Sequence, residues 1–251
     1  MSISILAKAK PEDIKLDPYP HIVIRNAIDE PLYNQLSKEY PSTEEIWKKD
    51  TGPNDKLLNN TRYQVSSNTL LESTLWNVFV NYHTSPEFYQ EVVALFGNHM
   101  EDIHGIYGKY GKSVEELSSG PRVGGGMFAE STRGQADVGL DCQVGMNSPV
   151  TEQSRVIGMH VDQPNKIFVS MLYMRESHDD SVGGNLQIYR HKDGHERNMD
   201  ISNMEIHSTI EYDRNTVVFF INSSYSIHAV TLRNPTPHRR RLVNFIGEVY
   251  K

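Results

Sequence analysis

The sequence is poor in cysteine and in positive charge. Its 251 residues include one cysteine, Cys142, which excludes an intrachain disulfide and any site built from several thiolates. We therefore expect any metal site to use histidine and carboxylate side chains. The formal net charge of −7 argues against a general nucleic-acid surface, which is normally basic, so we expect no nucleic-acid partner.

The sequence also lacks a long apolar run. The opening stretch, MSISILAKAKPEDIK, has only a few apolar residues before charges appear, so we expect neither a signal peptide nor a transmembrane helix. Apolar residues make up 37% of the chain and charged residues 23%, which is the range of folded globular proteins. These features predict a cytoplasmic protein without a membrane partner.

The first half of the chain has the pattern of a short strand followed by helices. Residues 21–26 precede IDEPLYNQLSKEY, which predicts a strand, a turn and a helix. Residues 68–104 place apolar side chains three and four apart, with a break at Ser85-Pro86, and so predict two helices. The glycine-rich residues 105–126 lack the spacing of a phosphate-binding loop, and we expect an ordinary loop there.

The second half consists of short apolar segments separated by turn residues. The eight segments are VGLDCQVGM, SRVIGMHVD, KIFVSMLYM, NLQIYR, EIHSTIEY, NTVVFFIN, SIHAVTL and RRRLVNFIGEVY. Eight such strands predict a jelly roll. We expect one domain over residues 1–251, mainly β with flanking α, in which residues 1–133 form a strand and helical support packed outside a core of residues 134–251.

Three His-x-Asp pairs occur, and their surroundings distinguish them. The pairs at 178–180 and 191–193 lie in polar, turn-like stretches that are typical of solvated loops. His160 and Asp162 instead end an apolar run, and Pro164 follows in a turn. Residues i and i+2 of a strand face the same side, so this pair can reach one ion. Two histidines and one carboxylate are the ligand set of non-haem iron(II) sites.

A third ligand should come from a distant strand. The late segment VVFFINSSYSIHAVTL offers His228, although a histidine in an apolar strand is often a core residue. His238 is the weaker candidate because the preceding NPTP interrupts the strand. Together with His160 and Asp162, His228 would complete an iron site.

The last segment supplies cations for a carboxylate ligand. Arginine offers a carboxylate two charge-assisted hydrogen bonds from one planar group. Because strand residues alternate in direction, Arg239 and Arg241 share one face and Arg240 lies on the other. We expect one of the three to point inward, whereas by composition alone the three would form a solvated charged run.

At this point the sequence resembles the 2-oxoglutarate and iron(II)-dependent oxygenase superfamily, most closely its prolyl-hydroxylase-like branch. The resemblance covers roughly the C-terminal half. Its motifs, in the order and approximate spacing of the family core, are HVDQPN, SMLYM, GGNLQIYR, VVFFINSSYSIHAV and RRRLVNFIG. The resemblance implies a double-stranded β-helix of the jelly-roll, cupin-like type.

Carried over residue by residue, the resemblance implies roles for particular side chains. The implied catalytic metal ligands are His160, Asp162 and His228. The arginine that binds the far carboxylate of 2-oxoglutarate would be Arg241, with Arg239 as the alternative. Tyr173 matches a tyrosine that contacts the same co-substrate in many relatives.

Three further polar residues are candidates to bind the co-substrate or the substrate. The strand before the metal pair should face the same cavity, so Gln143 and Asn147 are candidates to hydrogen-bond the co-substrate or the substrate. Arg190 ends the segment NLQIYR and could bind an anionic substrate at the mouth or lie on the surface.

The implied activity is a hydroxylation. The family uses iron(II), 2-oxoglutarate and O2, and releases succinate and CO2. The substrate stays open among a protein side chain, an amino acid and a small metabolite, so the partner is a small molecule or a peptide, and the oligomeric state is open too. The alternative is a cupin-like metal-binding protein or isomerase without oxygenase activity, which would not account for the arginines of the last segment.

Overall fold

The computed structural model describes residues 2–51, 57–123, 136–193 and 201–249. The helices are α1 (Glu30–Lys38), α2 (Thr43–Thr51), α3 (Thr74–His83), α4 (Pro86–His104) and α5 (Ile106–Tyr110), with short 3-10 turns at Pro11–Asp13, Val114–Glu116 and Ile201–Asn203. The strands are β1 (His21–Arg25), β2 (Arg62–Val65), β3 (Ser119–Pro121), β4 (Val138–Asn147), β5 (Lys166–Tyr173), β6 (Leu186–His191), β7 (Met204–Ile210), β8 (Thr216–Ile221), β9 (His228–Val230) and β10 (Arg240–Val249). The protein is therefore mainly β with flanking helices, as the sequence predicts.

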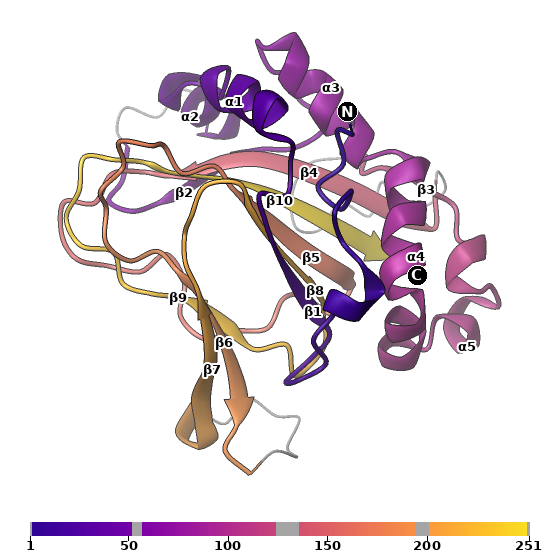
Figure 1. Cartoon of the computed structure of the whole chain (residues 1–251). Helices are drawn as coiled ribbons and strands as arrows, with labels where there is room; N and C mark the ends of the chain where they lie inside the picture. Colours follow the sequence, from indigo (N-terminus) through magenta and orange to yellow (C-terminus); the bar gives the residue numbers. More distant parts are fainter. Residues whose placement is uncertain (1, 52–56, 124–135, 194–200, 250–251) are drawn as a thin grey trace.

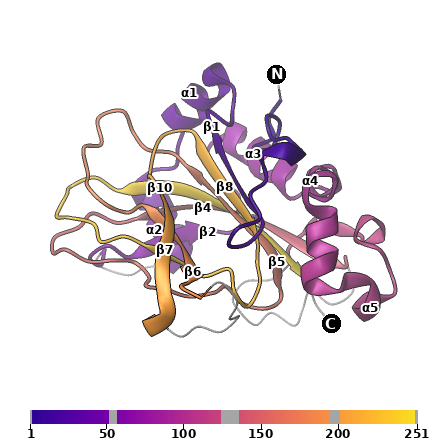
Figure 2. The ribbon, with the colours of Figure 1, turned by 60° about the horizontal axis from the view of Figure 1, so that its bottom comes forward.

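The strands form two sheets. The larger sheet has seven strands in the order β1-β8-β5-β10-β4-β2, with β3 paired in parallel to β4, and the smaller sheet has the order β7-β6-β9. The other pairs between named strands are antiparallel. Two strands from the first half, β1 and β2, form the ends of the path through the larger sheet, so both halves of the chain build it (Figures 1 and 2).

The helices and the smaller sheet lie on opposite sides of the larger sheet. In Figure 1, α1 to α4 lie along one side of it, and β6, β7 and β9 lie on the other. Serine side chains cap two of the helices: Ser73 accepts from the backbone of Trp76 at the start of α3, and Ser85 accepts from Phe88 at the start of α4. Among the described residues, no helix has the length and apolar content needed to cross a membrane.

Each face of the larger sheet has its own apolar core. The outer core joins helix residues such as Trp76 and Phe96 to sheet residues such as Phe245. The inner core, between the two sheets, contains Tyr173 and Leu242. Because side chains alternate along a strand, each long central strand contributes to both cores.

Two local predictions need correction. Residues 154–162 were expected to form a strand, but they make only isolated bridges, between Ser154 and Arg233 and between His160 and His228. Residues 105–126, expected to form a loop, include α5, which lies between Gly105 and Gly111, both at positive φ. These glycines adopt the left-handed conformation that ends one helix and lets another begin.

Candidate metal centre and anion site

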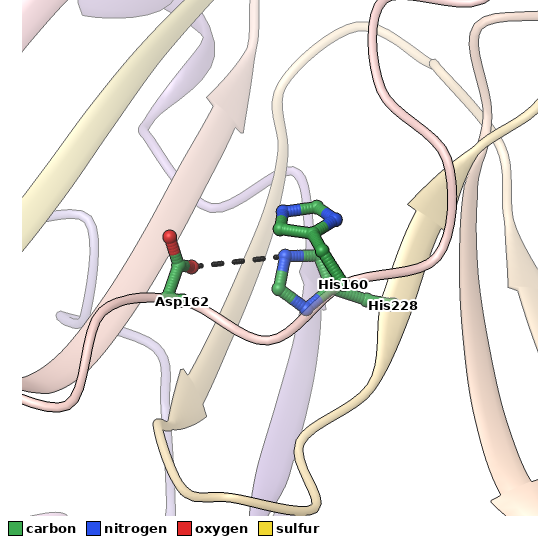
Figure 3. Close-up of side chains that lie close together, drawn as sticks. All are labelled: His160, Asp162 and His228. Atoms are coloured by element: carbon green, nitrogen blue, oxygen red, sulfur yellow. Dashed lines mark ion pairs between the residues drawn. The ribbon is translucent and has the colours of Figure 1, made fainter. Parts of the chain in front are cut away.

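Three side chains predicted as metal ligands lie together. His160, Asp162 and His228 each offer a ligand atom, and these atoms all lie within 4.8 Å of one another (Figure 3). The backbones of the two histidines exchange two hydrogen bonds of 3.0 Å, and their ring centres are 4.2 Å apart. Asp162 follows two residues after His160, and its Oδ2 lies 3.7 Å from Nε2 of His228. Residues 154–162, although not a regular strand, therefore place His160 and Asp162 on the same side, as a strand would.

Both histidines are oriented by backbone carbonyls. Nδ1 of His160 lies 2.9 Å from the oxygen of Gly158, and Nδ1 of His228 lies 2.9 Å from the oxygen of Ser226. A carbonyl oxygen can only accept, so Nδ1 carries the proton and Nε2 keeps its lone pair for a metal. Burial, and then the proximity of His160, lower the pKa of His228 to about 4, which keeps this imidazole neutral at neutral pH.

The carboxylate of Asp162 is fixed by a neighbouring cation. Nζ of Lys166 donates to Oδ1 of Asp162 at 2.8 Å. Burial raises the pKa of Asp162, but the positive charge of Lys166 outweighs it and leaves the pKa below its ordinary value. Asn222 stabilises the turn that follows Asp162. Its Nδ2 donates to the carbonyls of Gln163 and Lys166 at 2.9 Å each. The carboxylate is therefore ionised and held.

This arrangement fits a non-haem iron(II) ion. Two imidazoles and one carboxylate on one side of a shared point are the donor set that this metal takes, with positions left for other ligands. The second ring nitrogen of each histidine already has its hydrogen-bond partner, as ligand histidines generally do.

The three residues open on a cavity of about 810 Å³. Besides the three, its charged lining residues are Lys49, Asp50, Arg62, Arg122, Asp141, Lys166 and Glu248. Gln143 lines it as expected; its Nε2 donates to Asp141 at 2.8 Å, and its Oε1 accepts from Asn244 at 3.3 Å. A cavity with so many polar groups is suited to a polar ligand.

A group of buried donors without acceptors lies in the inner core. Arg240 is 1% exposed, and its Nη1 donates to Oδ1 of Asn147 at 3.1 Å. Nε and Nη2 of Arg240, Nδ2 of Asn147 and the hydroxyl of Tyr173 have no hydrogen-bond partner within the described part of the chain. The guanidinium lies 4.9 Å from the ring centre of Tyr173. Buried unpaired donors are costly, so this group is suited to an anionic ligand.

The other two arginines lie on the opposite face of β10. Nη2 of Arg241 donates to Oγ of Ser37 in α1 at 2.8 Å, and Nη1 of Arg239 donates to the carbonyl of Pro41 at 2.8 Å. Neither arginine lines the cavity. The expectation that Arg241, or else Arg239, points into the cavity is therefore not met, because the register of β10 places both on the face opposite Arg240. Arg240 does not line the cavity either, and which of the three binds the co-substrate stays a prediction.

The alternation along β10 could have identified Arg240. Arg240, Asn244 and Glu248 share one face, whereas Val243 and Phe245 share the other with Arg241. The even positions of β10 mix polar residues with Leu242 and Ile246, which is typical of a face toward a polar cavity, whereas Val243 and Phe245 at odd positions indicate a helix-covered core.

Arg62 and Arg190 lie in different environments. Arg62 lines the cavity from β2, a strand that the sequence pattern does not predict. Arg190 lies on the surface, where its Nε binds Oε1 of Glu205 at 2.7 Å, and it does not line the cavity.

No protein-family model and no curated protein matches the sequence. Solved structures do match. A prolyl 4-hydroxylase of Pseudomonas putida is 11% identical, with a TM-score of 0.54, over 99% of this chain and 100% of that chain. A prolyl hydroxylase of Trichoplax adhaerens, solved with a peptide of the hypoxia-inducible factor oxygen degradation domain, is 11% identical, with a TM-score of 0.52, over 95% of this chain and 89% of that one.

A prolyl 4-hydroxylase structure from Phytophthora capsici is 17% identical, with a TM-score of 0.49, over 99% of this chain, and this chain spans 63% of its length. The Pseudomonas putida and Trichoplax adhaerens structures share the overall arrangement of elements over nearly the whole of this chain. The chain therefore has the fold of these two prolyl hydroxylases.

Proposed function

We propose that this protein is an iron(II) and 2-oxoglutarate-dependent dioxygenase that hydroxylates a substrate and releases succinate and CO2. The observation that carries the proposal is the pairing of a two-histidine, one-carboxylate cluster with a group of buried, unpaired donors in one fold. In this proposal the first holds the metal and the second binds a carboxylate. Their combination is what an iron(II) oxygenase with a dicarboxylate co-substrate requires.

In this proposal His160, Asp162 and His228 hold the iron. Two protein features do the positioning. The carbonyls of Gly158 and Ser226 fix the ring orientation of the histidines, and Lys166 fixes the carboxylate of Asp162. When bound, the iron would supply the activation of O2 that is coupled to oxidative decarboxylation of 2-oxoglutarate.

The far carboxylate of 2-oxoglutarate binds Arg240 in this proposal. Arg240 has two unpaired donor atoms, and a carboxylate accepts two hydrogen bonds from a guanidinium. Tyr173 and Asn147 each add one donor beside it. Gln143 lines the cavity and is proposed to contact the co-substrate or the substrate.

The fold is proposed to be a double-stranded β-helix, with the larger and smaller sheets as its two walls and the cavity between them. Residues 1–251 would act as one oxygenase domain, since β1 and β2 pair into the same sheet as the later strands. The substrate would be a small molecule or a peptide, and the buried state of the single cysteine is compatible with a cytoplasmic location.

The test is an anaerobic titration of the metal-free protein with iron(II) and then 2-oxoglutarate, following the visible charge-transfer band. Wild type should develop the band, and His228→Ala should not. Arg240→Met should raise the dissociation constant for 2-oxoglutarate by roughly 30-fold or more, because removing one partner of a buried charge pair costs about 2 kcal/mol or more.

Arg241→Met is the matched control, since it removes a neighbouring arginine from the opposite face of β10. Its dissociation constant for 2-oxoglutarate should stay close to that of wild type once circular dichroism shows that it is folded. Absence of the band in folded, iron-loaded wild type would refute the proposal and favour a cupin-like metal protein without oxygenase activity.

A further inference from the structure

Arg62 lines the cavity and forms no ion pair with a carboxylate among the described residues. Its Nε donates to Oε1 of Gln64 at 2.9 Å, and its Nη2 is buried and has no acceptor among the residues that the structure describes. No carboxylate oxygen of that same set lies within ion-pair distance of Arg62. An unpaired buried charge is costly unless a ligand neutralises it.

The other cations of the cavity lining already have acidic partners. Lys49 lies 2.8 Å from Glu45, and Lys166 lies 2.8 Å from Asp162. Arg122 contacts both Asp141 and Glu248, at 3.4 and 3.2 Å. Among the described lysines and arginines that line the cavity, Arg62 is therefore the one without an acidic partner. The buried Arg240 and Arg233 also have no ion pair in this part of the chain, although neither of them lines the cavity.

The sheet places these two arginines on either side of one asparagine. In the register of β2, β4 and β10, Arg62 is opposite Asn147, and Asn147 is opposite Arg240. Directly opposed residues project to the same face of a sheet, and neighbouring strands lie about 4.8 Å apart. Long arginine side chains on the two outer strands can thus converge above Asn147, whose Nδ2 is itself unpaired.

The pKa of Arg62 indicates that the charge of Arg240 lies close to it. Burial, followed by the charge of Arg240, lowers the pKa of Arg62 to about 10, so Arg62 stays charged at neutral pH. Two guanidinium groups that repel each other across a shared amide donor are stabilised by an anion between them. A carboxylate is the anion whose two oxygens can accept from donors on both sides.

We propose that Arg62 is a second arginine of the co-substrate site, which binds the far carboxylate of 2-oxoglutarate together with Arg240, across Asn147. This inference rests on the proposed function. It assigns a binding role to a residue of β2, a strand that lies outside the segment carrying the metal ligands. The opposing assignment, in which Arg62 binds an acidic group of the primary substrate, makes a different prediction for the experiment below.

The experiment compares two 2-oxo acids that differ in the far carboxylate. Anaerobic iron(II)-loaded protein is titrated with 2-oxoglutarate and with 2-oxopentanoate, which has the same chain length but a methyl end. The measured quantity is the ratio of the two dissociation constants, read from the charge-transfer band. A purely structural role of Arg62 would change both constants equally and leave the ratio unchanged.

In wild type 2-oxoglutarate should bind more tightly than 2-oxopentanoate. Arg62→Met should reduce this preference by about tenfold or more, with little change for 2-oxopentanoate, and Arg62→Lys should retain part of it. Lys49→Met is the matched control, because it removes a cavity cation that already has a partner, and its ratio should equal that of wild type. An unchanged ratio in Arg62→Met would overturn the inference and assign Arg62 to the primary substrate or to the fold.

A metal-independent measurement separates this inference from the proposed function. Glutarate, which lacks the keto group, should raise the thermal midpoint of metal-free wild type, and the increase should be lost in Arg62→Met and kept in Lys49→Met. If no charge-transfer band forms but the glutarate effect depends on Arg62, the oxygenase proposal fails and the two-arginine dicarboxylate site stands. If glutarate stabilises wild type and Arg62→Met equally, the site fails.

Discussion

Protonation of His83 should make the fold sensitive to acid. His83 ends α3 and is 1% exposed, with its ring against Phe79, Phe88 and Phe245. Its Nδ1 donates to the carbonyl of Phe79 at 2.8 Å, and its Nε2 accepts from the backbone N–H of Ile5 at 3.2 Å. If Nε2 were protonated, it would become a donor and could no longer accept the hydrogen bond from the N–H of Ile5. Burial accordingly lowers the pKa of His83 to about 3.

The sign of the effect follows from this pKa. The unfolded chain binds a proton at His83 below about pH 6.5, whereas the folded chain does so only near pH 3, so stability is full above pH 6.5 and falls as the pH decreases. Between pH 7.5 and pH 5.0 this single group should remove about 2 kcal/mol from the free energy of unfolding.

The assay is urea unfolding at these two pH values, followed by tryptophan fluorescence, for wild type and His83→Gln. Glutamine cannot titrate, so the variant should be less stable at pH 7.5 but should lose about 2 kcal/mol less than wild type on acidification. An equal loss in the two proteins would show that His83 does not carry the acid sensitivity and would refute the reasoning.

Three further predictions concern packing and reactivity. Gly247→Ala should destabilise the fold by roughly 3 kcal/mol in urea unfolding, since the added Cβ would lie 2.2 Å from Cε1 of the buried Phe168. Gly184→Ala should weaken 2-oxoglutarate binding in the titration above, because Gly184 has φ +78° and a Cβ there would lie 3.0 Å from Cδ of Arg240. Burial raises the pKa of the Cys142 thiol, so a thiol reagent should modify it far more slowly in native protein than in urea.

The residues of the candidate metal site could be predicted from the sequence because they stand out from their immediate neighbours. His160 and Asp162 are separated by one residue and follow an apolar run, and His228 lies in an apolar segment near the end of the chain. The structure brings the three together, and their role as ligands stays a prediction. The segment that carries the first two is not a regular strand, since its single bridge to His228 is enough to align it.

The sequence alone does not predict which arginine of β10 faces the smaller sheet. Arg239, Arg240 and Arg241 are chemically identical neighbours, and only the pairing of Arg240 with Asn147 decides which of them faces inward. Arg62 had no signal at all, because its place beside Asn147 depends on β2 pairing with a strand about eighty residues later in the chain.

The sequence by itself therefore determined the strand-rich second half, the two central helices and the residues of the candidate metal cluster, because periodicity and short spacings are properties of neighbouring residues. The tertiary structure decided which face each strand turns inward, and so which cations lack a partner in the cavity. That choice depends on register between distant strands, where a shift of one residue exchanges the buried and exposed faces.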